Sequence, residues 1–170
     1  MKRKLLFWSF LGLLLSYLGL NYIDSILQNG NLDFGIIAFE LAGNLTASNI
    51  IIQEWIDGDI IHLASFSLGF DFLFMLFYVA FLSFWTSVLA DSFYKNSHRY
   101  IATIVISLFI IAGILDGIEN YALLNLLGEN NNEEWSVMAF YCASIKFGLI
   151  GLGIIYNLVV SIGKLFVKIQ

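Results

Sequence analysis

Four long apolar stretches, separated by short polar segments, dominate the chain. They cover residues 5–27, 61–89, 100–127 and 135–158. Each stretch is long enough to cross the hydrocarbon core of a bilayer as a helix, which takes about 20 residues. The pattern therefore predicts an all-α integral membrane protein, a four-transmembrane-helix bundle with several passes through the bilayer.

The segment between the first two stretches, residues 31–60, is too polar and too interrupted to span a membrane. Within it, residues 34–42 and 46–56 have the pattern of two short helices, the second with an apolar face around Trp55. Such helices lie in the membrane interface or cap a bundle. We expect an outer interfacial segment here, and a single membrane domain over residues 1–170.

Polar residues mark the expected helix ends. Asn29-Gly30 suits the end of the first helix, since glycine readily takes a left-handed conformation there. Asn131, followed three residues later by Glu134, resembles a capping box and predicts the start of the fourth helix. That helix is expected to continue towards Phe166.

Composition agrees with the membrane class. Of the 170 residues, 59% are hydrophobic and 12% are charged, whereas a soluble domain carries about 25% charged residues. The mean hydropathy is +0.84 and the isoelectric point is about 4.8. A nucleic-acid partner is not expected, because there is no basic patch beyond the residues that set the topology. Because Cys142 is the single cysteine, an internal disulfide is excluded. We interpret Cys142 as a packing residue.

Basic residues fall on one side of a four-span topology. Seven of the eight Lys and Arg residues lie there: Lys2, Arg3, Lys4, Lys95, Arg99, Lys164 and Lys168. The positive-inside rule therefore puts both termini in the cytoplasm. The opposite side carries acidic residues: Asp33, Asp57, Asp59, Glu129, Glu133 and Glu134.

The third apolar stretch carries two acids and a carboxamide near its centre. Asp116, Glu119 and Asn120 stand at i, i+3 and i+4, so they share one helix face. A charge at bilayer depth costs about 2.5–3.5 kcal/mol on the insertion scale, so this face should contact protein. Gly113 and Gly117, four residues apart, have the small-residue spacing that lets another helix come close.

Charged residues of the neighbouring stretches lie at a similar depth. Asp71 belongs to the second stretch and Lys146 to the fourth. At about 1.5 Å per residue, the groups of all three stretches lie roughly 10–20 Å from the outer ends of their helices. We expect Lys146 to pair with Asp116 or Glu119. At least one of the other carboxyl groups is then protonated near neutral pH or binds a cation, because so many carboxylates cannot stay ionised in a low-dielectric site.

Further polar residues flank this group. Ser67 lies one turn before Asp71, and Tyr78 lies two turns after it. Glu40, between apolar residues of the outer segment, either leans over the site as a lid carboxylate or is solvated, and both alternatives stay open. The candidate ligand- or proton-binding residues are Asp71, Asp116, Glu119, Asn120, Lys146, Glu40 and Tyr121.

A metal site is a weaker interpretation. The acids of the group could bind a metal together with His62, but Lys146 competes for them. No dense His/Cys spacing supports a transition metal, so neither a metal nor a cofactor is expected.

Three functions fit these observations. In the first, the bundle binds or moves a proton, a small cation or a small amphipathic ligand, with Lys146 as counter-charge, and transport would need a homo-oligomer. In the second, a membrane enzyme applies carboxylate acid–base chemistry to a lipophilic substrate. In the third, the chain is a non-catalytic assembly subunit. A buried Lys146 ion pair that only fixes helix order is the structural alternative to a site.

The architecture resembles that of the sterol-isomerase-like EXPERA membrane proteins, with four spans, cytoplasmic ends and membrane carboxylates near the outer side. Residues 113–121 match no motif of that family, so the resemblance assigns no residue a role. The sequence predicts the class of the protein, its topology and the place of a site.

Overall fold

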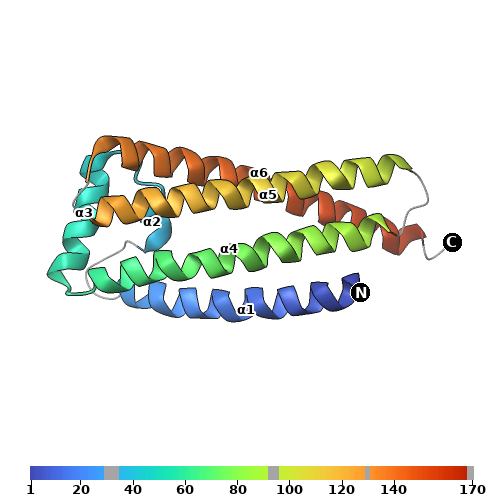
Figure 1. Ribbon diagram of the computed structural model, residues 1–170, viewed down its shortest axis with the longest axis horizontal. Helices are drawn as coiled ribbons and strands as arrows, with labels where there is room; N and C mark the ends of the chain where they lie inside the picture. Colours follow the sequence, from blue (N-terminus) through green and yellow to red (C-terminus); the bar gives the residue numbers. More distant parts are fainter. Residues whose placement is uncertain (29–34, 92–95, 129–130, 168–170) are drawn as a thin grey trace.

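The computed structural model describes residues 1–28, 35–91, 96–128 and 131–167, which form six α-helices and no strand (Figure 1). Four helices are long: α1 (Lys2–Leu27), α4 (Ile61–Ala90), α5 (Asn96–Leu127) and α6 (Glu133–Val167). Two are short: α2 (Ile36–Glu40) and α3 (Leu45–Asp57). The predicted order of elements is thereby confirmed, and the four long helices are long and apolar enough to cross a membrane.

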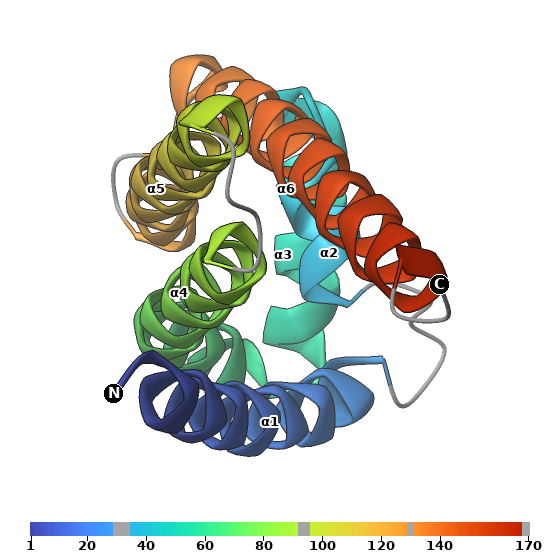
Figure 2. The ribbon, with the colours of Figure 1, turned by 90° about the vertical axis from the view of Figure 1, so that its right-hand side faces the viewer.

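The long helices form a curved row rather than a closed bundle. Along this row, α1 packs on α4, α4 packs on α5, and α5 packs on α6. Figure 2 looks along the helices from the end that holds the termini and shows α1 and α6 at the two ends of the row, with one side open between them. No substantial contact joins α1 to α6 in the part of the chain that is described.

The short helices close one end of this row. α3 lies across the end opposite to the termini (Figure 1). α2 is shorter than the predicted 34–42, because the chain turns towards α3 through Gly43, whose φ of 71° is left-handed and favours glycine. The start of α2 is fixed by Asp24 of α1, whose Oδ1 accepts a hydrogen bond from the first amide of α2 at 2.8 Å. Asn44 then caps α3 by accepting from its third amide at 2.8 Å.

The cap is also tied to the start of α6. The amide of Leu45 donates to Glu133 Oε2 at 2.8 Å, and the buried hydroxyls of Ser48 and Ser136 are hydrogen-bonded at 2.8 Å. Below these contacts, fully buried apolar side chains from α1 to α5 pack into one core: Leu27, Phe39, Trp55, Leu68, Leu123 and Leu126. The α3 end of the molecule is therefore a packed cap.

The predicted start of α6 was wrong by one residue. α6 begins at Glu133, and Asn132 Oδ1 accepts a hydrogen bond from Trp135 N at 3.2 Å. Asn131 lies outside this cap, and its side chain donates to Asn49 Oδ1 of α3 at 2.7 Å. The predicted end of the first helix at residues 29–30 lies outside the described residues.

Two contacts fix α4 against its neighbours. A Cβ added at Gly113 of α5 would lie 2.7 Å from Val79 Cγ2, so a larger residue does not fit there. At Gly117 the nearest atoms would be 3.8 Å away, an ordinary contact. Further along, Thr86 donates to Asn157 Oδ1 of α6 at 2.9 Å, a hydrogen bond between two helices.

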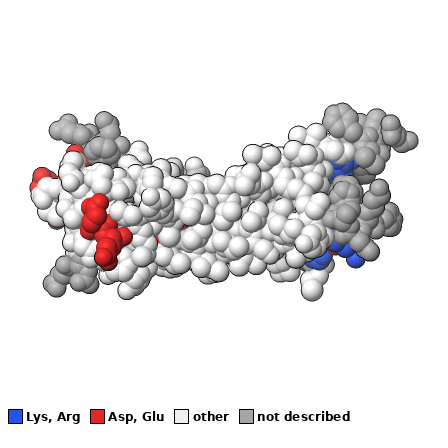
Figure 3. Space-filling view, turned by 90° about the horizontal axis from the view of Figure 1, so that it is seen from above, with Lys and Arg blue, Asp and Glu red and all other residues white. Residues whose placement is uncertain are grey.

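Charged residues collect at the two ends of the molecule. Figure 3 shows Lys and Arg at the end that holds the termini, and Asp and Glu at the α3 end. At the first of these ends, Lys2 Nζ donates to both carboxylate oxygens of Asp91, at 2.9 and 2.8 Å. Lys95 and Lys168 lie outside the described residues. The long apolar surface between the ends is the part that a bilayer would cover.

Candidate functional site

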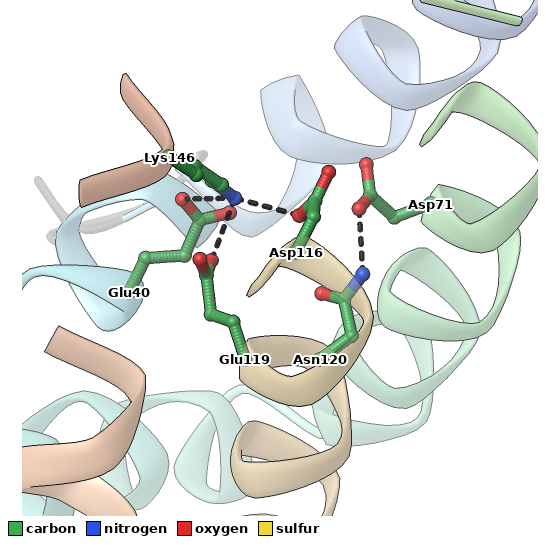
Figure 4. A network of polar contacts seen from close by, with 6 residues as sticks. All are labelled: Glu40, Asp71, Asp116, Glu119, Asn120 and Lys146. Atoms are coloured by element: carbon green, nitrogen blue, oxygen red, sulfur yellow. Dashed lines mark hydrogen bonds and ion pairs between the residues drawn. The ribbon is translucent and has the colours of Figure 1, made fainter. Parts of the chain in front are cut away.

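Lys146 is the centre of an ion-pair cluster inside the bundle (Figure 4). Its Nζ donates to Glu119 Oε1 at 2.7 Å and to Asp116 Oδ1 at 2.8 Å, and lies 3.5 Å from Glu40 Oε2. The lysine is only 5% exposed, and all three acidic residues are buried. Three carboxyl groups from α2 and α5 thus share one ammonium group from α6.

Asp71 joins the cluster from α4. Asn120 Nδ2 donates to Asp71 Oδ2 at 2.6 Å. Asn120 follows Glu119 directly, so one turn of α5 holds a carboxylate against α6 and a carboxamide against α4. In Figure 4, Asp71 and Asp116 lie side by side, each with one oxygen in a contact and the other oxygen on the same side of the cluster.

Four residues of the cluster form the charged end of a cavity of about 570 Å³: Glu40, Asp71, Asp116 and Lys146. The cavity is lined by α1, α2, α4, α5 and α6, on the open side of the row. Its far end is apolar and includes Leu13, Phe74, Leu82, Trp85, Ile150 and Ile154. Its rim is formed by four side chains that line the cavity and are also exposed at the surface: Tyr17 and Asn21 of α1, Ile37 of α2 and Phe147 of α6. The cavity is therefore open sideways, between α1 and α6.

Tyr78 is a further polar residue of the cavity wall. It lies two turns after Asp71 on α4 and is 6% exposed, and Asp116 is among the charged groups around it. Its hydroxyl has no hydrogen-bond partner among the described residues, and the same holds for Glu119 Oε2 and Asn120 Oδ1. An unpaired buried polar group costs about 1–3 kcal/mol. Such a group in a cavity wall is therefore a feature that needs an explanation.

The structure brings six of the seven candidate residues together. They are Glu40, Asp71, Asp116, Glu119, Asn120 and Lys146. Of the two alternatives for Glu40, the structure shows a buried carboxyl beside the cluster and not a solvated one. Burial raises the pKa of this carboxyl, while the nearby Lys146 opposes that rise. Tyr121 is not part of the cluster: it is exposed and its ring packs edge-on against Trp135, with centroids 5.6 Å apart.

His62 also lies away from the cluster and is exposed. Within the described ranges, no group of three or more His, Cys, Asp or Glu side chains is placed to bind a metal ion. Tyr78 was predicted only as a residue flanking the group, and its i+7 spacing from Asp71 puts both on one helix face. Comparison of the chain with protein-family models, with curated proteins and with solved structures finds no match.

Proposed function

We propose that the four long helices span a membrane and that the protein binds a small amphipathic molecule in the cavity between α1 and α6. The polar part of the ligand lies at the Lys146 cluster and the apolar part lies along α4 and α6. The observation that carries this proposal is the division of the cavity into a charged, buried end and an apolar length. Its volume of about 570 Å³ falls in the range of about 300–1,000 Å³ typical of small-molecule pockets.

The composition of the cluster supports a binding role over a purely structural one. One carboxylate is enough to pair Lys146, yet three carboxyl groups contact it and Asp71 lies beside them. Buried ion pairs add little net stability, because desolvation offsets most of the attraction. Surplus acid at bilayer depth is costly, and such residues usually mark binding or proton pathways.

The membrane placement follows from composition and charge. Four helices qualify as spans by length and hydropathy. In the proposed orientation the basic end of Figure 3, with both termini, lies in the cytoplasm. The α2–α3 cap then lies on the outer side, and the opening between α1 and α6 faces the lipid.

Filling the cavity tests the proposal. Ile150 of α6 lines the cavity, whereas Leu152, two residues later, is 62% exposed and lies outside it. Ile150→Trp should weaken binding of a twelve-carbon amphipath such as dodecanol by about tenfold or more, and Leu152→Trp should leave it unchanged. Dissociation constants are measured on the purified chain in nanodiscs. Equal affinities of the two variants would show that binding occurs elsewhere.

A membrane enzyme is the second candidate. The side-by-side carboxyl groups of Asp71 and Asp116, with Tyr78 nearby, would allow one group to donate a proton and another to accept it. Incubation with a lipid extract followed by mass spectrometry tests this. A product that is lost in Asp71→Asn and retained in the exposed control Asp59→Asn supports catalysis, while saturable binding without any product excludes it for that extract.

A further inference from the structure

The donors of the cluster are directed at its own acids. Lys146 Nζ has three N–H groups and three carboxyl neighbours, Glu119, Asp116 and Glu40. The amide nitrogen of Asn120 donates to Asp71. An anionic ligand would therefore meet carboxylates at the polar end of the cavity, and it would find the ammonium group already engaged.

Acceptors, in contrast, face the cavity. Asp71 and Asp116 line it, and in each of them one carboxylate oxygen accepts the hydrogen bond described above, while the Tyr78 hydroxyl is a further neighbour of the Asp116 carboxyl. The Tyr78 hydroxyl, buried in the same wall, is unpaired. An ionised carboxylate only accepts hydrogen bonds, and a phenol oxygen can accept one as well. The complementary group is a cation with several donors.

Building on the function proposed above, we propose that the ligand is a single-chain amphipath with a cationic amine head. Its ammonium group lies between Asp71, Asp116 and Tyr78, where three N–H donors meet three acceptors. The added positive charge also offsets the surplus acid, since the cluster holds four carboxyl groups and a single ammonium group among its described residues. An anionic head at the same place would be repelled.

The apolar length of the cavity fits one alkyl chain. Its wall on α4 runs from Asp71 to Trp85, 14 residues apart in the sequence. At about 1.5 Å per residue this is about 21 Å, which exceeds half of the hydrocarbon thickness of about 30 Å. Each methylene group that packs along this wall adds contacts with apolar side chains, so affinity should rise with chain length.

The route into the site runs through the lipid. The packed α2–α3 cap covers the polar end from the outer solution, with Trp55 and Phe39 fully buried inside it. The rim residues Tyr17, Ile37 and Phe147 lie on the open side, between α1 and α6. An amphipath dissolved in the bilayer can slide in sideways, whereas a short water-soluble amine has neither the chain nor the access.

The test compares four probes on the purified full chain in nanodiscs at neutral pH and fixed salt. They are dodecylamine, dodecanol, dodecanoate and ethylamine, and affinities are corrected for partition into empty nanodiscs. We expect dodecylamine to bind at least about tenfold more tightly than dodecanol. Dodecanoate should bind more weakly than dodecanol, and ethylamine should bind at least about a hundredfold more weakly than dodecylamine.

Two variants examine the head group. Asp71→Asn removes a charge and keeps an oxygen for the Asn120 amide, so the preference for dodecylamine over dodecanol should disappear. Tyr78→Phe removes an unpaired hydroxyl, so it should weaken dodecylamine binding about fivefold without lowering the melting temperature. Asp59→Asn and Tyr141→Phe, both at exposed positions outside the cavity, are the matched controls and should bind like the wild type.

The outcomes separate the two proposals. Equal binding of dodecylamine and dodecanol, or an amine preference that survives both variants, overturns the cationic head and leaves the cavity as the binding site. Ethylamine that binds as tightly as dodecylamine overturns the alkyl chain. If none of the twelve-carbon probes binds, the proposed function itself fails. Should Asp71→Asn not fold, Tyr78→Phe alone decides on the head group.

Discussion

Lys146 holds the charged interior together. Its ammonium group is buried between carboxyl groups of three residues, with the shortest contact to Glu119, which has no exposed surface. Removal of the lysine leaves this carboxylate buried without its counter-charge, which is far more costly than removal of both partners.

Lys146→Met should therefore lower the free energy of unfolding by about 3–5 kcal/mol. The double variant Lys146→Met with Glu119→Gln should recover part of this loss, because one of the three carboxyl groups left without a counter-charge is then neutral, while Asp116 and Glu40 remain. Unfolding is followed by circular dichroism in detergent micelles. Lys2→Met, which breaks only the exposed pair with Asp91, is the control and should have little effect. A double variant less stable than the single one would contradict this assignment.

Glu40 gives the stability a pH dependence. Burial raises the pKa of its carboxyl, so the folded protein keeps this proton to higher pH than the unfolded chain does. Its contribution to stability is fully present below the ordinary glutamate range and is lost as the pH rises through the raised value. Glu40→Gln should flatten the profile of melting temperature against pH above that range. A Glu40→Gln profile that matches those of the wild type and the exposed control Glu134→Gln would disprove this.

At the residue scale, spacing along α5 was enough to predict which side chains meet. Asp116, Glu119 and Asn120 lie on one face, and the cost of exposing that face to lipid turns it inwards. Tyr121 lies away from the cluster because it follows Asn120 by one residue, which is a rotation of about 100° around the helix axis. This rotation places its ring on the exposed surface. The place of Glu40 depends on how the chain turns before α3, which no periodicity describes.

At the element scale, the packing of α4 against α5 depends on Gly113. An added methyl group would collide with Val79, whereas at Gly117 it would only touch its neighbours. Gly113→Ala should destabilise the protein by about 1–3 kcal/mol through overpacking. Gly117→Ala, one turn later on the same helix, should be neutral or stabilising, because alanine favours a helix by about 1 kcal/mol over glycine. Unfolding in detergent measures both, and equal losses would contradict the assignment.

Helix number and order followed from hydropathy, whereas several helix ends did not. α5 begins at Asn96, before the apolar stretch that predicted it, since hydropathy marks the expected lipid contact and not the hydrogen-bonded helix. α6 ends at Val167, which agrees with its expected continuation towards Phe166. The cap of α6 shifted from Asn131 to Asn132 because two neighbouring asparagines offer the same chemistry, and the contact of Asn131 with α3 decides between them.

At the scale of the whole molecule, the sequence does not predict the cavity. The long helices are apolar around most of their surface, so their pattern does not say which neighbours meet. The cavity exists because α1 packs on α4 and not on α6, and because α2 folds into the space between them at the α3 end of the molecule. Oligomerisation and transport stay predictions, to be tested once a ligand is known.

The proposed orientation predicts which positions can be labelled from outside. With Cys142 replaced by alanine, a cysteine at Asp59 should react with a membrane-impermeant maleimide on intact cells. A cysteine at Arg99 should react only after permeabilisation, because the positive-inside rule places it in the cytoplasm. The reverse labelling pattern would mean that the topology is inverted. Labelling of both cysteines from outside would contradict four spans.

The most direct test of the binding site is an experimental structure of the full chain in nanodiscs loaded with dodecylamine. We predict elongated density between α1 and α6, with its head within hydrogen-bonding distance of Asp71 and Asp116 and its tail running towards Trp85. A structure in which α1 closes against α6, with no density beside the Lys146 cluster, would contradict the central claim.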